Sequence, residues 1–197
     1  MDWSVLRDSL MALPILSSAI RWWIARRYRG PLVFPDRQSL ERVYPLASLL
    51  RDSTQIFGLL ISGQGLLREI DDKLVASRVK QIVLPNPSVS ALSNIQQSLS
   101  HMSAMFNLPN DVRNATDSAK KLKIEVLWYP EFLGITALIG DPSEKRGWAH
   151  VEICLPHMHP NFRPIVRLEK KRDSETFDRL WDTYQAIAKK SVVPSTP

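Results

Sequence analysis

The hydrophobic pattern is clearest in the last third of the chain, from residue 123 onward. Four short apolar runs occur there, KIEVLWYP, GITALIGD, AHVEICLP and RPIVRLEK, and turn residues separate them. Short apolar runs bounded by turn residues are typical of β-strands. The segment that follows, SETFDRLWDTYQAIAKK, has the apolar spacing of an amphipathic helix. We therefore predict four strands closed by one helix.

A strand–turn–helix–strand pattern precedes this block. The runs IFGLLIS (56–62) and VKQIVLPNP (79–87) are predicted to be buried strands, and LLREIDDKLVAS between them is predicted to be a helix. This spacing indicates a βαβ unit, in which the two strands are parallel. We predict one α/β domain, residues 34–190, with a mixed β-sheet, helices on both faces and a flexible tail at 191–197.

Three further segments complete the expected order of elements. Residues 39–53 have helical periodicity, with Pro45 near the middle, and SALSNIQQSLSHMSAMF (90–106) is predicted to be a helix. The segment LPNDVRNATDSAKK (108–121) is so polar that we predict a connector. Gly30-Pro31 and Phe34-Pro35-Asp36 predict a hinge before the domain.

Residues 1–33 are expected to form a separate N-terminal amphipathic helix. An uncharged run at 10–20 is too short to span a membrane and is followed by tryptophans and arginines. Indoles beside cations suit a membrane interface, and they equally suit packing on the domain or on a partner protein. The predicted docking residues are Trp22, Trp23, Arg26, Arg27 and Arg29.

Composition limits the compartment and the partners. The 197 residues hold a single cysteine, Cys154, so no internal disulfide can form, and its apolar surroundings predict a buried, inert thiol. With no secretory signal pattern, a cytoplasmic location is expected, with membrane association left open. The net charge of +6 favours an anionic partner: nucleic acid, a nucleotide or an acidic membrane surface. No cofactor is expected.

Two kinds of position are candidates for anion binding. The turn at 62–65 lies between a predicted strand and a predicted helix, where backbone N–H groups favour an anion. Basic clusters stand in later turns, although such clusters are usually solvated loops and helix ends. The candidate anion-binding residues are Ser62, Gly63, Gln64, Gly65, Lys145, Arg146, Arg163, Lys170, Lys171 and Arg172.

One cluster has the residue types of a metal site. In AHVEICLPHMHP, the spacing of His150 and Glu152, and of His157 and His159, places side chains on one face of an extended segment. The alternative is that His150 and Glu152 lie on the solvent face of a strand and the other two in a loop. No nucleophile motif occurs, and no catalytic residue is predicted.

Three segments together resemble one half of the phospholipase D superfamily fold. They are IFGLLISGQGLLREI with VKQIVLPNP, the hairpin ITALIGDPSEKRGWAHVEI, and the closing helix FDRLWDTYQAI. The family's active motif is His-x-Lys, four residues and Asp. If Asp141 is that Asp, Gly134 and Thr136 stand where histidine and lysine belong. The resemblance therefore implies a degenerate motif and no phosphohistidine chemistry.

The leading hypothesis is a non-catalytic regulatory, ligand-sensing or assembly subunit with a phospholipase D-like domain. It would bind an anionic ligand, either nucleic acid or a phosphorylated small molecule, or a partner protein, including a second copy of itself. One alternative is a membrane-associated effector anchored by residues 3–29. Another is a metal-dependent hydrolase that uses the histidine cluster at 150–159.

Overall fold

The computed structural model describes residues 31–70, 73–88, 92, 107–131, 133–154, 158 and 162–194. The strands are β1 (Leu32–Phe34), β2 (Ile56–Leu59), β3 (Val79–Pro85), β4 (Glu125–Tyr129), β5 (Ile135–Gly140), β6 (Trp148–Ile153) and β7 (Ile165–Glu169). The helices are α3 (Arg37–Glu41), α4 (Leu46–Asp52), α5 (Gln64–Glu69), α6 (Lys73–Arg78), α8 (Leu108–Lys121) and α9 (Ser174–Lys190).

The described strands form one seven-stranded mixed sheet in the order β1-β7-β6-β5-β2-β3-β4. The pairs β2·β3 and β3·β4 are parallel, and their crossovers contain α5 with α6, and α8. The remaining pairs are antiparallel, so β5, β6 and β7 follow one another as a meander. The predicted βαβ unit and the four predicted C-terminal strands are therefore confirmed.

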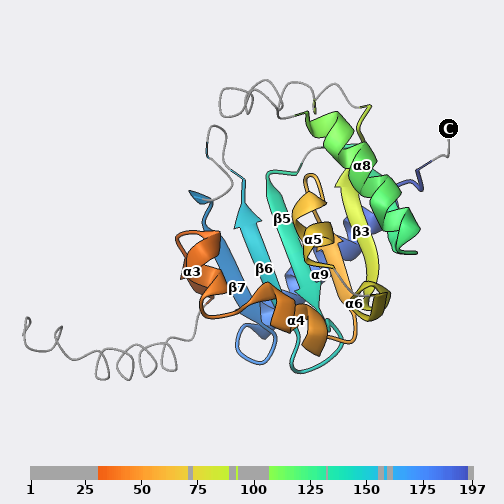
Figure 1. The fold of residues 1–197 in the computed structure, drawn as a ribbon. Coiled ribbons are helices and arrows are strands. Elements are labelled where there is room, and N and C mark those ends of the chain that lie inside the picture. The colour runs from red at the N-terminus through yellow and green to blue at the C-terminus, as the bar shows by residue number, and fades with distance from the viewer. Residues whose placement is uncertain are drawn as a thin grey trace, which may run out of the picture.

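Helices cover both faces of the sheet, as predicted. Helix α9 packs on one face, and α3, α4, α5, α6 and α8 lie over the other (Figure 1). Alternate strand residues supply two cores: Ile56, Ile82 and Val126 pack under the helices of the second face, whereas Val83 and Ile139 pack against α9. This alternation is the two-residue period of a strand buried on both sides.

The predicted polar connector at 108–121 is wrong, because it is helix α8. Its apolar stripe is narrow, half of it is alanine, and many polar residues surround it: Leu108, Val112, Ala115 and Ala119 are all fully buried. Asn107 caps the helix, with its side chain accepting from the backbone N–H of Asn110. The stripe has helical spacing, and the surrounding polar residues concealed it.

Three more segments show features that the sequence did not predict. The predicted hinge contains β1, which pairs antiparallel with β7 and extends the sheet to Leu32. In the predicted flexible tail, Val192 and Trp128 exchange backbone hydrogen bonds of 2.7 and 2.9 Å, which covers part of the edge of β4. The helical stretch predicted at 39–53 is divided into α3 and α4, and Pro45 caps the second.

Several predictions fall on residues outside the described part of the chain. These are the N-terminal helix with Trp22, Trp23, Arg26, Arg27 and Arg29, most of the helix at 90–106, and the histidines at 157 and 159. Within the described part, the helices are all too short or too polar to cross a membrane.

Packing between β5 and β6 predicts a destabilising substitution. Gly140 pairs with Trp148, and a Cβ at 140 would overlap the indole, which donates to Ser53 Oγ at 2.9 Å. Gly140→Ala should therefore lower the free energy of unfolding in urea by about 1–3 kcal/mol.

The matched control is Gly134→Ala, at a position where a Cβ would have no heavy atom within 4 Å. Its effect should stay within about 0.5 kcal/mol of zero. Equal losses for the two variants would contradict the packing argument.

Candidate functional site

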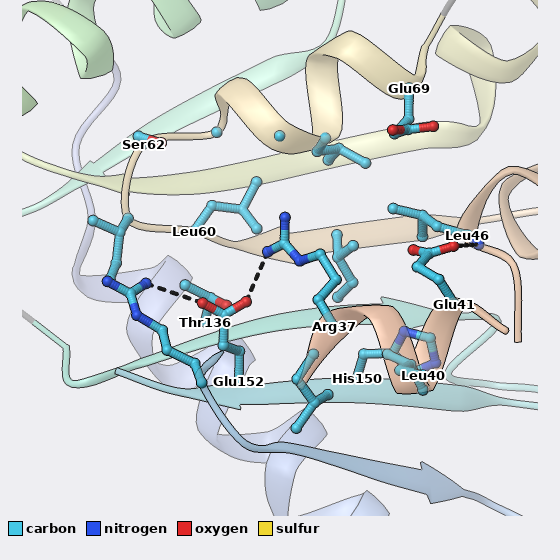
Figure 2. A pocket seen from close by; sticks show the side chains of 17 residues that line it. Arg37, Leu40, Glu41, Leu46, Leu60, Ser62, Glu69, Thr136, His150 and Glu152 are labelled. Atoms are coloured by element: carbon cyan, nitrogen blue, oxygen red, sulfur yellow. Dashed lines mark hydrogen bonds and ion pairs between the residues drawn. The ribbon is translucent and has the colours of Figure 1, made fainter. Parts of the chain in front are cut away.

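A cavity of about 230 Å³ lies on the many-helix face of the sheet, between α3 and α5. Its floor is formed by alternate residues of the meander: Thr136 and Leu138 on β5, His150 and Glu152 on β6, and Ile165 on β7. Its walls are residues of α3, α4 and the segment 60–66, together with Arg163 and Glu69. Figure 2 shows Arg37 reaching across this space toward Glu152.

Glu152 is the centre of the polar floor. It is 5 % exposed, and each of its oxygens accepts from a different arginine. Arg163 Nη1 donates to Oε1 at 3.0 Å and Arg37 Nη2 donates to Oε2 at 2.7 Å (Figure 2). A carboxylate can remain charged at this depth only where such hydrogen-bonded partners compensate its desolvation.

The two arginines differ in their exposure. The side chain of Arg163 is 8 % exposed, whereas that of Arg37 is 52 % exposed. Nε of Arg163 is buried and has no hydrogen-bond partner among the residues that the structure describes. A buried donor without an acceptor costs about 1–3 kcal/mol and is uncommon in native proteins.

His150 belongs to a second buried pair. Its Nε2 lies 2.7 Å from Arg167 Nη1, and because a guanidinium has no acceptor, the imidazole nitrogen accepts and the ring is neutral. Burial, and secondarily the charge of Arg167, lowers the pKa of His150 to about 3. The Arg167 guanidinium also stacks on the ring of Tyr44, 3.8 Å from its centroid.

The expectation that His150 and Glu152 lie on the solvent face of a strand is wrong. They are 8 % and 5 % exposed, because α3 and the segment that follows it cover this part of the sheet. Their polar atoms are paired with Arg167 of β7, with Arg163 of the segment before β7 and with Arg37 of α3. None of these partners is close in sequence, so the local pattern could not indicate them.

The predicted metal cluster is not assembled by the residues the structure describes. Among them, no three potential metal ligands lie together. Both oxygens of Glu152 and Nε2 of His150 are held by arginines, while His157 and His159 lie outside the described residues. Next to the site, burial raises the pKa of the Cys154 thiol to about 11, which fits the predicted inert cysteine.

The predicted anion-binding residues divide between opposite ends of the sheet. Ser62, Gly63, Gly65 and Arg163 line the cavity. Gln64 is turned toward α8, where its Nε2 donates to the carbonyl of Asp111 at 3.3 Å. The other five stand in the turns beyond β5 and β7, which lie together because Lys170 N donates to Gly147 O at 2.8 Å. Those five are Lys145, Arg146, Lys170, Lys171 and Arg172.

Most charges in these turns are already paired. Arg146 lies 2.7 Å from Glu144, Lys170 lies 3.2 Å from Asp178, and Arg172 lies 3.0 Å from Asp173. Lys145 and Lys171 are exposed and form no ion pair with other described residues. The turns therefore present much less positive potential than their sequence suggests.

Asp141 connects the β5–β6 hairpin to the start of β2. The residue is 3 % exposed, and its Oδ1 accepts from Thr54 N, Thr54 Oγ1 and Gln55 N at 2.8, 2.7 and 2.9 Å. Its φ of 48° is in the left-handed region, which aspartate tolerates better than most residues. The turn that begins at Asp141 is thus held by a tertiary contact across 87 positions of sequence.

The fold is similar to that of a phospholipase D family member of known structure. It resembles Nuc, a phospholipase D family member from Salmonella typhimurium, with a TM-score of 0.51 and 9 % identity over 85 % of this chain and 100 % of Nuc. It also resembles TrmBL2, an archaeal chromatin protein with a novel mode of DNA binding, with a TM-score of 0.48 and 14 % identity. That likeness covers 98 % of this chain and 66 % of TrmBL2.

In sequence, no known family profile matches the chain, and no curated protein matches it either.

Sequence reasoning missed Arg37 and Arg167. Arg37 begins a short helix directly after the predicted hinge, and nothing nearby in sequence marks it. For Arg167 a signal did exist, because a cation in the middle of the apolar run PIVRLE must either face solvent or have a buried partner. Its partner, His150, is its direct neighbour across β6 and β7.

The neutral state of His150 predicts a pH dependence of stability. Because its pKa falls from 6.5 to about 3 on folding, the unfolded chain binds a proton that the folded chain does not at intermediate pH. The contribution of neutral His150 to the free energy of unfolding is fully present above pH 6.5 and is lost as the pH falls toward 3. In His150→Gln, the side-chain oxygen can still accept from Arg167, but no group titrates.

We expect the unfolding free energy of the wild type to fall relative to that of His150→Gln as the solution is acidified. The difference should change by up to about 1.4 kcal/mol per pH unit between about pH 6 and pH 4. Urea unfolding of both proteins at several pH values measures it. A difference independent of pH would show that His150 also protonates in the folded state.

Proposed function

We propose that this protein is a non-catalytic, phospholipase D-like ligand-sensing module, which binds a small molecule bearing an anionic group in the cavity between α3 and α5. The observation that carries the proposal is the half-exposed guanidinium of Arg37, which lines the cavity and is held there by Glu152 at 2.7 Å. A cation fixed at a cavity wall is pre-organised to pair with an anion.

The absence of catalysis is supported by the motif positions. In the frame set by Asp141, the lysine position is Thr136, on the cavity floor, and the histidine position is Gly134. The nearby imidazole of His150 accepts from Arg167, so its Nε2 lone pair is occupied. Oδ1 of Asp141 accepts from Thr54 and Gln55, and its Oδ2 lies 3.4 Å from Arg146 Nε. These positions offer no nucleophile and no phosphate-binding ammonium.

The space beside Arg37 suits a ligand. Its Nη2 is used by Glu152, and a Cβ at Gly65 would lie 3.5 Å from its Nη1. With its side chain 52 % exposed, Arg37 keeps part of its surface accessible despite these neighbours. The hydroxyls of Ser62 and Thr136, both half-buried, line the same cavity and can donate to a bound oxygen.

The cavity is a better candidate for the anion-binding site than the basic turns are. A nucleic-acid surface needs several uncompensated cations to contact successive phosphates. At the turns with Lys145 and Lys171, the neighbouring Arg146, Lys170 and Arg172 are paired with carboxylates. Binding of nucleic acid, of a membrane through residues 3–29 or of a partner protein stays a prediction.

A thermal-shift screen with Arg37→Gln tests the proposed function. Small carboxylates, sugar phosphates, nucleotides and neutral compounds of matched size are each titrated against both proteins. At least one anionic class should raise the melting temperature of the wild type saturably, since a ligand at a hundred times its Kd stabilises by about 2.7 kcal/mol. Arg37→Gln should lose that response.

The control is Arg179→Gln, because Arg179 is an exposed arginine of α9 that pairs with Glu175. It removes one positive charge far from the cavity and should respond like the wild type. Anions that stabilise all three proteins equally, or none of them, would contradict the proposal.

A further inference from the structure

The composition of the cavity wall narrows the class of ligand that the proposed function requires. Two guanidiniums, those of Arg37 and Arg163, face three carboxylates in the lining, those of Glu41, Glu69 and Glu152. His150 adds no charge, because its ring is neutral. A dianionic phosphate would therefore meet more negative than positive charge, whereas a monoanion beside Arg37 would not be opposed as strongly.

The shape of the free donor edge favours a carboxylate. Arg37 already binds one carboxylate, that of Glu152, through Nη2 alone. Its Nη1 lies near Gly65, where a Cβ would be 3.5 Å away, and the Arg37 side chain as a whole is 52 % exposed. A guanidinium edge and a planar carboxylate match in geometry, and such pairs are commonly bidentate.

Most of the remaining wall is aliphatic. Leu46, Leu60 and Leu138 line the cavity and are only partly buried, so their side chains have surface left for a ligand to cover. Figure 2 shows Leu60 beside the Arg37–Glu152 pair, and Leu46 with Glu41 at the other end. An apolar body attached to the anionic group would bury this surface and gain affinity from it.

We infer that the ligand is an amphiphilic monocarboxylate, an aliphatic or aryl carboxylic acid whose carboxylate pairs with Arg37 and whose apolar body lies against Leu46, Leu60 and Leu138. The inference rests on the proposed function, since it names the class of molecule bound at the same site. It replaces the phosphorylated ligand expected from the sequence with a carboxylate.

Isothermal titration calorimetry of the full chain with four probes tests this class. The probes are butanoate, hexanoate, hexanamide and hexyl phosphate. Each added methylene should tighten binding about three- to fourfold, so hexanoate should bind roughly tenfold more tightly than butanoate. Hexanamide should not bind measurably, and hexyl phosphate should bind at least about tenfold more weakly than hexanoate.

Variants assign these effects to their residues. Arg37→Gln should abolish binding of both carboxylates, whereas Leu60→Gln should remove most of the difference between butanoate and hexanoate. Leu46→Gln serves the same purpose if Leu60→Gln fails to fold. Val193→Gln, at a site that is 71 % exposed and absent from the cavity lining, is the matched control and should bind like the wild type.

The outcomes separate the inference from the proposed function. Arg37-dependent binding of hexyl phosphate as tight as that of hexanoate would overturn the carboxylate class and leave the proposed function standing. Equal affinity for butanoate and hexanoate would contradict the inference that an apolar body of the ligand lies against the leucines. Binding of none of these probes would overturn the inference, and binding that is unchanged in Arg37→Gln would overturn both.

Discussion

A buried carboxylate on the central sheet requires compensation, and Glu152 obtains it from two directions. Arg163 approaches from the segment before β7, and Arg37 approaches from α3, 115 positions away in sequence. The second contact ties a short helix at the start of the domain to the middle of the meander. The pairing of Arg37 with Glu152 therefore helps to hold α3 over the meander, on one side of the cavity that separates α3 from α5.

The two faces of the sheet consequently have different roles. The α9 face is filled with apolar side chains, such as Val83, Ile139 and Phe177, and it contributes stability through burial. The opposite face has an apolar half beneath α5, α6 and α8 and a polar half beneath α3. This polar half is the part of the sheet from which we infer binding.

A feature of this structure is predictable from the sequence where it depends on residues that are neighbours in the chain. The meander and α9 were predicted because period and turns are properties of neighbouring residues. Helix α8 was missed because its stripe, including Ala115 and Ala119, is small and surrounded by polar residues. The site was predicted only in part, since Glu152 was identified as a candidate but was placed on the solvent face of its strand. Glu152 can be buried because Arg37 and Arg163 pair with it. Pairing between residues so far apart in the sequence leaves no periodic pattern of polar and apolar positions.

The central claim is that Glu152 holds one structural arginine and one ligand-facing arginine, and urea unfolding of Arg163→Gln and Arg37→Gln tests it most directly. Removing the 8 % exposed partner should cost about 3 kcal/mol or more. Removing the 52 % exposed partner should cost about 1 kcal/mol or less. Similar losses for the two variants, or the larger loss for Arg37→Gln, would contradict the account.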